Sequence, residues 1–189
     1  QQFSSDDKQQ NENITANIST FSRPIDFSSA KNIKIFGKIV NTDCNSGIEN
    51  IKVEGYKCKS DSINGLKRGP NIIYLFKVDN LKICHLGYLG EFINNELIKI
   101  LSNADILFIP IGGNLCLNGI DAYSLSEKLN AKYIIPMCYK NNYNNFYFNG
   151  PKDFLSYCKN VVSIKTDTVY LSDFYNSNIP STILMHNVL

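Results

Sequence analysis

The stretch NIIYLFKVDNLKICHLGYLGEFINNELIKILSNADILFIPIGGNLCLNGIDAYSLSEKLNAKYIIPMCYK, residues 71–140, decides the fold. It contains apolar runs of strand length, and each ends in a glycine-containing turn or a short polar tail. A segment with the helical spacing of apolar residues separates the last two runs. This order predicts an α/β domain whose rigid strands end at one edge, with the chemistry in the loops just beyond.

The elements inside this stretch follow from local patterns. The runs IIYLFKV and LKICHLG are separated by Asp79-Asn80, which predicts a β-hairpin. Residues 94–101 and 120–129 have helical spacing, and Asn130 is the expected C-cap of the second helix. The unbroken runs ADILFIPIGG and AKYIIPM predict strands that are covered on both faces.

The segments on either side are less regular. Residues 1–30 lack periodicity and are rich in Gln, Ser, Asn and Asp, which predicts an irregular or mobile N-terminal arm before a domain at 31–189. The alternating segments NIKIFGKIV and IKVEGYKC, on either side of a polar turn, predict an antiparallel hairpin. After a polar-aromatic loop we expect a short helix in DFLSYCKN, two short strands in VVSIKTDTVYLSDF and a last strand in STILM.

Composition narrows the class of protein. With 189 residues, 43% of them hydrophobic, the chain is expected to form one globular domain. A net charge of +2 gives little support for nucleic-acid binding, and no apolar run reaches the ~20 residues of a membrane span. None of the six cysteines forms a CxxC pair, so neither a zinc ribbon nor a thioredoxin-type site is indicated. Cysteines in apolar runs favour an intracellular, reducing compartment; an organelle stays open.

Four motifs in register resemble one family. They are RGPN (Arg68 to Asn71), HLGYLGE (His85 to Glu91), ILFIPIGG (Ile106 to Gly113) and IPMCYK (Ile135 to Lys140). Together they resemble the metallo-β-lactamase superfamily, in its ascorbate-phosphate-lactonase-like branch of metal-dependent hydrolases, whose members read RG-x-N, HLGDLGH, VLLIPVGG and IPMHYKT. The resemblance covers roughly 31–185. It implies a metallo-β-lactamase-like αββα sandwich that lacks part of its N-terminal half, because no HxHxDH motif is present.

The departures from the family pattern fall on its metal ligands. The chain has only two histidines, His85 and His186. The substituted family positions are Ser60 (a His near this point), Tyr88 (the bridging Asp), Glu91 (the closing His) and Cys138 (a His). Zinc hydrolases need several nitrogen and oxygen ligands and an open position for water. The resemblance therefore implies a degenerate metal site and favours a pseudoenzyme.

Each former-site position also has a structural explanation. His85 is expected to be a hydrogen-bonded structural residue, and Tyr88 to fill space that a metal would occupy. Gly112 and Gly113 are expected to serve a sharp turn after a strand, and Lys140 to be solvated unless it meets an anionic ligand. Cys138 is expected to be a core or rim thiol rather than a lone zinc ligand. A hydrolytic triad of Ser60, Asp61 and His186 has nothing in the sequence to place its members together.

Three functions follow from these observations. The first is a non-catalytic binding or structural subunit without a cofactor, with a protein partner or a second copy covering the apolar surface left by the missing half-sheet. The second is a metal-dependent hydrolase of the lactonase or phosphodiesterase type, using zinc, manganese or iron, whose ligands lie outside this chain. The third is a metal-free small-molecule binding module.

Overall fold

A computed structural model describes residues 14–23, 33–40, 45–48, 50–141, 147–166, 168–174 and 179–185. Its main element is an eight-stranded mixed sheet in the order β3-β4-β5-β6-β7-β8-β10-β9, and β1 and β2 form a separate two-stranded sheet. The strands are β1 (Ile14–Thr20), β2 (Ile33–Val40), β3 (Asn45–Ile48), β4 (Ile51–Lys59), β5 (Pro70–Val78), β6 (Leu81–His85), β7 (Ile106–Pro110), β8 (Tyr133–Met137), β9 (Val161–Ile164) and β10 (Ser181–Met185). The helices are α1 (Asn95–Leu101), α2 (Gly119–Leu129), α3 (Lys152–Leu155) and the 3-10 helix η2 (Leu171–Phe174).

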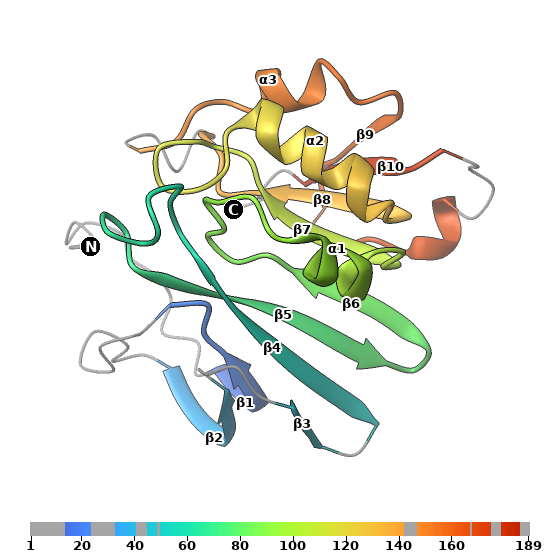
Figure 1. The fold of residues 1–189 in the computed structure, drawn as a ribbon. Coiled ribbons are helices and arrows are strands. Elements are labelled where there is room, and N and C mark those ends of the chain that lie inside the picture. Colours follow the sequence, from blue (N-terminus) through green and yellow to red (C-terminus); the bar gives the residue numbers. More distant parts are fainter. Residues whose placement is uncertain are drawn as a thin grey trace, which may run out of the picture.

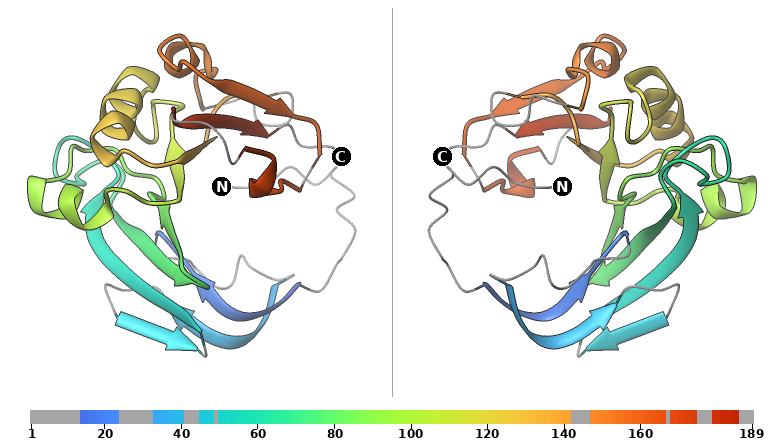
Figure 2. Two further views of the ribbon diagram at one scale, coloured as in Figure 1. Left: turned by 90° about the vertical axis from the view of Figure 1, so that its right-hand side faces the viewer. Right: turned by 90° about the vertical axis from the view of Figure 1, so that its left-hand side faces the viewer.

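The large sheet has a hydrophobic core on each face. Helices α1, α2 and α3 cover one face (Figure 1), where Leu101, Ala122 and Leu129 join the apolar side chains of the central strands. The β1–β2 sheet lies on the opposite side, against β4 and β5 (Figure 2), and Ile18 packs there on a smaller core that includes Tyr74. The chain is thus mixed α/β: helices pack on one face of the large sheet, and the small β1–β2 sheet packs on the opposite face.

The central strands and their helices agree closely with the elements predicted from the sequence. The predicted hairpin is confirmed: β5 and β6 are antiparallel, with Val78 opposite Leu81, and both turn residues have a positive φ, 47° at Asp79 and 71° at Asn80. These angles suit the two-residue turns that match the twist of paired strands. The two predicted helices are also confirmed, and Asn130 ends α2 in the left-handed conformation.

Part of the expected irregular arm is ordered. Residues Ile14–Thr20 form β1, which pairs in parallel with β2. Isoleucine and threonine favour strands, and Ile18 gains an apolar surface on which to pack. The prediction of irregular structure was therefore wrong for this segment, whereas the rest of the arm, apart from Phe21 to Arg23, lies outside the described residues.

Two other strand predictions were wrong in detail. The strand at Ile33–Val40 exists, but it pairs with β1; the antiparallel partners of β4 are β3 and β5. Near the C-terminus, the first predicted strand is β9, while the second is replaced by the 3-10 helix Leu171–Phe174. Alternating apolar residues indicate a strand but do not name its partner, since pairing also depends on distant segments.

The direction of the strands creates one shared edge. Strand β4 is antiparallel to β5, β5 is antiparallel to β6, and β6, β7, β8 and β10 are mutually parallel. The carboxyl ends of β4, β6, β7, β8 and β10 therefore meet at the same edge of the sheet. Every motif selected from the sequence lies at or just beyond this edge.

Two composition-based expectations can be compared with the described residues. Within them, no helix has the length and apolar character needed to cross a membrane. The five cysteines described there, Cys58, Cys84, Cys116, Cys138 and Cys158, are free thiols; Cys44 lies outside these residues.

Candidate active-site edge

The former-site positions lie in the segments that follow four strands. Ser60 comes directly after β4, Tyr88 and Glu91 come after β6, the glycine pair after β7, and Cys138 directly after β8. His85 is the last residue of β6. The topology thus brings segments that are up to about 80 residues apart in the sequence to one edge of the sheet.

An arginine lies at the centre of these positions. The guanidinium of Arg23 stacks over the Tyr88 ring at 4.2 Å from its centroid. Its Nε donates to Ser60 Oγ at 3.4 Å, and a terminal nitrogen donates to the carbonyl of Leu115 at 3.4 Å. The Tyr88 hydroxyl in turn contacts the Cys138 thiol. We call Arg23, Ser60, Tyr88, Cys138 and the Leu115 carbonyl the Arg23 cluster.

Arg23 follows β1 by three residues, and backbone hydrogen bonds hold this segment at the edge of the large sheet. The two residues before it are fixed to β5: the carbonyl of Ser22 accepts from Ile72 N at 2.9 Å, and the carbonyl of Phe21 accepts from Tyr74 Oη at 3.0 Å. Tyr74 is itself almost completely buried. The small sheet therefore has a specific role, because it places a cation among the ends of the large sheet's strands.

The charge of Arg23 has no carboxylate partner among the described residues. Two described acids adjoin the cluster, Asp61 beside Ser60 and Glu91 in the Tyr88 loop, and both accept other hydrogen bonds. Both oxygens of buried Asp61 accept backbone N–H groups, from Ile63, Gly65, Lys67 and Arg68, at 2.7 to 3.1 Å. Burial would raise the pKa of Asp61, but these four bonds outweigh it and lower that pKa. Glu91 Oε1 accepts from Lys59 N at 2.7 Å.

The thiols of this region are protonated at neutral pH. Burial raises the pKa of Cys138 to about 12, although the positive charge of Arg23 opposes the shift. Burial likewise raises the pKa of Cys116 to about 11. Nucleophilic cysteines act as thiolates, so neither residue is prepared for nucleophilic attack. Cys138 also has a positive φ, 54°, which is uncommon for a residue with a side chain.

Asn71 holds the loop that carries Tyr88. Its side chain is completely buried, and its Nδ2 donates to the Leu86 carbonyl at 2.9 Å and to Cys58 Sγ at 3.0 Å. Its Oδ1 accepts from Tyr88 N at 2.8 Å. One amide side chain therefore satisfies both backbone groups of a buried turn, as buried polar groups require.

The two glycines after β7 serve different needs. Gly113 has a φ of 65°, a left-handed conformation that suits a glycine in a sharp turn. Gly112 is needed for space: a Cβ there would overlap the Cys138 carbonyl oxygen and come within 2.8 Å of Phe148 Cβ. The Gly112 carbonyl also accepts from Asn149 N at 2.6 Å. Gly112 thus allows β8 and residues 148–149 to close around the loop.

His85 is enclosed rather than presented to a ligand. Its Nδ1 accepts from Gly87 N at 3.1 Å, and its ring lies 5.6 Å from that of Phe108. Burial lowers its pKa below 6.5, although a hydrogen bond opposes the shift. His85 is therefore neutral at pH 7.

This lowered pKa predicts a loss of stability in weak acid. Because the unfolded chain binds the proton more tightly, the contribution of His85 is present above its unfolded pKa and is lost as pH falls through the folded value. Urea unfolding between about pH 7 and pH 5 should show a falling free energy of unfolding, with a smaller fall in His85→Gln. The control is His186→Gln, which changes the other histidine of the chain. Equal pH dependence in wild type and His85→Gln would contradict this assignment.

The remaining predicted residues are less closely connected. Lys140 is exposed, and its backbone N donates to the Asn149 carbonyl at 2.9 Å. Of the triad considered above, Ser60 donates to the Pro70 carbonyl at 3.3 Å, Asp61 is committed to its own loop, and His186 lies outside the described residues. The described residues thus give no support for a hydrolytic triad.

Arg23 is the site residue that the sequence reasoning missed. It lies in the segment expected to be irregular, and no motif includes it. One signal was available: the chain has 19 basic residues, of which only Arg23 and Arg68 are arginines. Arginine offers a planar fork of donors that lysine lacks, so a rare arginine in a lysine-rich chain marks a position where that fork is useful.

The chemistry of the cluster does not fit a divalent metal. Its side chains offer a hydroxyl, a phenol, a protonated thiol and a guanidinium, and none is an imidazole or a carboxylate. Within the described part of the chain, no group of three His, Cys, Asp or Glu residues is arranged to hold a metal ion. A guanidinium among the strand ends also repels a cation.

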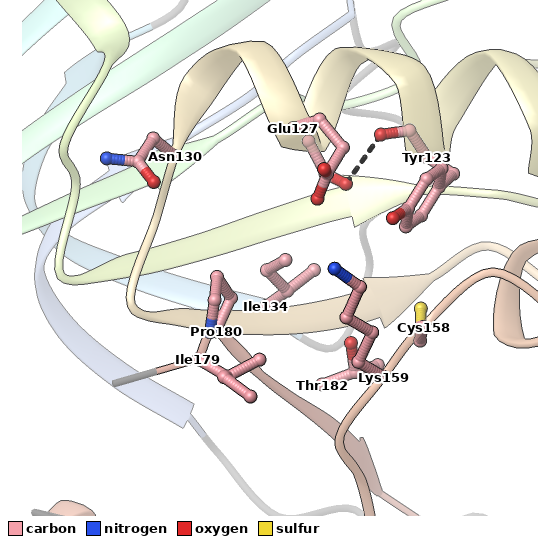
Figure 3. A pocket seen from close by; sticks show the side chains of 10 residues that line it. Tyr123, Glu127, Asn130, Ile134, Cys158, Lys159, Ile179, Pro180 and Thr182 are labelled. Carbon is pink, nitrogen blue, oxygen red and sulfur yellow. Dashed lines mark hydrogen bonds between the residues drawn. The ribbon is translucent and has the colours of Figure 1, made fainter. Parts of the chain in front are cut away.

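A separate hollow lies on the helical side of the sheet (Figure 3). It has a volume of about 290 Å³ and lies between α2, β8, β10 and the segment before β9. Glu127 and Lys159 both line it and bring opposite charges. The hollow therefore differs from the Arg23 cluster, where none of the described carboxylates pairs with the charge.

Comparison with known proteins agrees with the resemblance seen in the motifs. The family model described as "Beta-lactamase superfamily domain" matches residues 4–138. A metal-dependent hydrolase of Bacillus cereus is 31% identical over 104 residues, which are 55% of this chain and 43% of that protein. One from Carboxydothermus hydrogenoformans is 36% identical over 66 residues, 35% of this chain and 29% of that protein. The matched stretch thus spans less than half the length of these relatives.

Solved structures show the same fold. A proposed Zn-dependent hydrolase of the metallo-β-lactamase superfamily from Thermotoga maritima superposes with a TM-score of 0.75 and 24% identity, over 92% of this chain and 84% of that one. A proposed metal-dependent hydrolase from Parabacteroides distasonis gives 0.59 and 15%, over 92% of this chain and 78% of that one. The predicted metallo-β-lactamase-like fold is confirmed. The names of the relatives agree better with the metal-dependent alternative than with a non-catalytic role.

Proposed function

Because the chain belongs to the β-lactamase superfamily and yet carries an arginine among the positions expected to hold metal, we propose that it is a non-catalytic binding or structural subunit. The fold would serve as a scaffold, and the edge where the strands end would hold a ligand or a partner instead of cleaving a substrate. Function on a shared fold depends on the residues of the site, so the relatives' activity does not transfer by fold alone.

The position of Arg23 is the observation that carries this proposal. Three of the substituted positions, Ser60, Tyr88 and Cys138, are connected through this one side chain and its stacking partner. A guanidinium keeps its charge at any physiological pH, whereas a hydrolytic metal needs anionic or neutral donors around it. The edge is therefore arranged around an internal cation, and its thiols are protonated.

The names of the relatives favour a second candidate, a metal-dependent hydrolase of the lactonase or phosphodiesterase type. In this case the ligands come from residues outside the described part of the chain or from a partner. Arg23 would then have to lie outside the metal's coordination sphere. This candidate predicts a bound metal ion in the active protein, whereas the non-catalytic proposal predicts none.

Metal analysis separates the two candidates. After dialysis against zinc, manganese or iron and removal of free ions, we expect elemental analysis to find far less than one metal ion per chain, and no hydrolysis of a phosphodiester or lactone. Cys138→Ser serves as the matched variant, because it removes the thiol at the site while keeping a similar volume. One ion per chain together with hydrolysis would overturn the non-catalytic proposal, and loss of that ion in Cys138→Ser would locate it at this edge.

Partner binding is the remaining part of the proposal. Several large apolar side chains are exposed, among them Leu66 at 84% and Phe92 at 62%, in loops near the edge of the sheet. Such side chains are candidate contacts for another protein or a second copy. The free thiols among the described residues would fit a reducing compartment for the proposed subunit and its partner.

A further inference from the structure

We propose that the Arg23 cluster is a metal-free binding site for an oxyanion, a phosphate or carboxylate group of a small molecule. This inference deepens the proposed function and rests on it, since it names the ligand class of the same edge. Arg23 is the main donor, and Arg68 adds a second positive charge from the loop between β4 and β5.

The first argument is the unused hydrogen-bonding capacity of Arg23. A guanidinium has five N–H donors. The described structure gives Arg23 two hydrogen bonds, both at 3.4 Å and both to neutral oxygen atoms. These are longer than the 2.7 to 3.2 Å typical of N–H···O bonds. Most of the donor capacity therefore remains for a ligand.

The second argument is electrostatic. Arg23 is half-buried, and no carboxylate pairs with it within the described residues. A cation that is partly removed from water without a counter-charge costs free energy unless an anion compensates it. The described acids next to Ser60 and in the Tyr88 loop, Asp61 and Glu91, accept backbone N–H groups instead. An oxyanion that binds here would gain the charge-assisted bonds that the protein leaves unmade.

The third argument is the convergence of both arginines. Arg23 bonds Ser60 Oγ and the carbonyl of Leu115, and Ser60 N donates to the carbonyl of Gly69, the residue after Arg68, at 3.2 Å. Arg68 reaches this edge from the loop between β4 and β5, whose conformation Asp61 fixes through four backbone bonds. The chain thus places both of its arginines in segments that meet at Ser60, and arginine is the residue suited to two-pronged recognition of phosphate or carboxylate.

The fixed neighbours of Arg23 orient it for this role. The guanidinium carbon of Arg23 lies over the Tyr88 ring, 4.2 Å from its centroid, and this cation–π contact holds the side chain in place. Asn71 in turn fixes the backbone of Tyr88. A side chain held on its face in this way loses less conformational entropy on binding.

Titration calorimetry with inorganic phosphate tests the site, with acetate as the carboxylate arm, at constant ionic strength and on protein that has been depleted of metal and then dialysed free of chelator. We expect saturable binding of at least one of the two anions. The anion that binds more tightly shows whether the site prefers a phosphate or a carboxylate group. Arg23→Gln should weaken binding at least about tenfold, the effect of losing a charge-assisted hydrogen bond. Arg23→Lys should recover part of this loss, and Arg68→Gln should weaken binding several-fold.

The control is Lys132→Gln, which removes an exposed positive charge that pairs with Asp105 at the amino end of β8. Its affinity should equal that of the wild type. No saturable binding of either anion, or equal affinities in wild type, Arg23→Gln and Arg68→Gln, would overturn this inference. Because the protein is depleted of metal, anion binding and metal-dependent hydrolysis are measured independently. A bound metal with hydrolysis contradicts the proposed function alone, and absence of anion binding contradicts this inference alone.

Discussion

Gly112→Ala is expected to lower the free energy of unfolding by about 3 kcal/mol or more, because the added Cβ meets backbone that cannot move away freely. The methyl group would overlap the Cys138 carbonyl oxygen and crowd Phe148. Both neighbours are fixed: Ile111 N donates to the Met137 carbonyl just before Cys138, and Asn149 N donates to Gly112 itself. Urea unfolding at pH 7 measures the change, and the affinity for phosphate should fall with it, because Cys138 must shift.

Gly150→Ala is the matched control for this substitution. It adds the same methyl group to a glycine nearby, but no atom lies within 4 Å of the new Cβ. Its free energy of unfolding should stay within about 0.5 kcal/mol of the wild type, as for most surface substitutions. If Gly112→Ala were equally mild, the loop after β7 would not be closed as described.

Asn71→Leu is expected to destabilise the protein by about 2 to 4 kcal/mol, since it leaves buried backbone groups without their side-chain partner. Leucine has a similar volume but cannot accept from Tyr88 N or donate to the Leu86 carbonyl. The loop that presents Tyr88 would lose its support, so binding of phosphate should weaken as well. Urea unfolding and calorimetry on the same preparation measure both effects.

The control for this second substitution is Asn95→Leu, which makes the same chemical change at an exposed position in the first turn of α1. It should change the free energy of unfolding by less than about 0.5 kcal/mol. An equally small effect of Asn71→Leu would show that water or a shifted backbone satisfies the turn.

The parts of the fold that the sequence predicted are those set by local chemistry. Asp79-Asn80 allows one kind of tight turn, so the β5–β6 hairpin follows directly. Asn130 ends α2 because asparagine tolerates the left-handed conformation. The strand at Asn45–Ile48 was missed because Asn, Ser and Gly are typical of turns, and its pairing with β4 decides its conformation.

The sequence predicted which loops follow the strands at this edge, but it did not indicate Arg23. The motifs placed Tyr88, Gly112 and Cys138 after their strands, because each motif joins a buried strand to a turn. Arg23 could not be found in this way, since its contacts with Ser60 and Leu115 span 37 and 92 residues. Such contacts depend on how β1 packs against the sheet, and no local pattern describes that packing.

The attachment of β1 has a thermodynamic consequence. Arg23 reaches its place only while the Ser22 and Phe21 carbonyls stay bonded to β5, so the small sheet and the anion site form one coupled unit. Detachment of the N-terminal layer would remove the binding residue while the eight-stranded sheet stays intact, as in other local unfolding events. A bound anion would stabilise the state in which β1 is attached to β5, because a ligand that binds only this state shifts the equilibrium towards it.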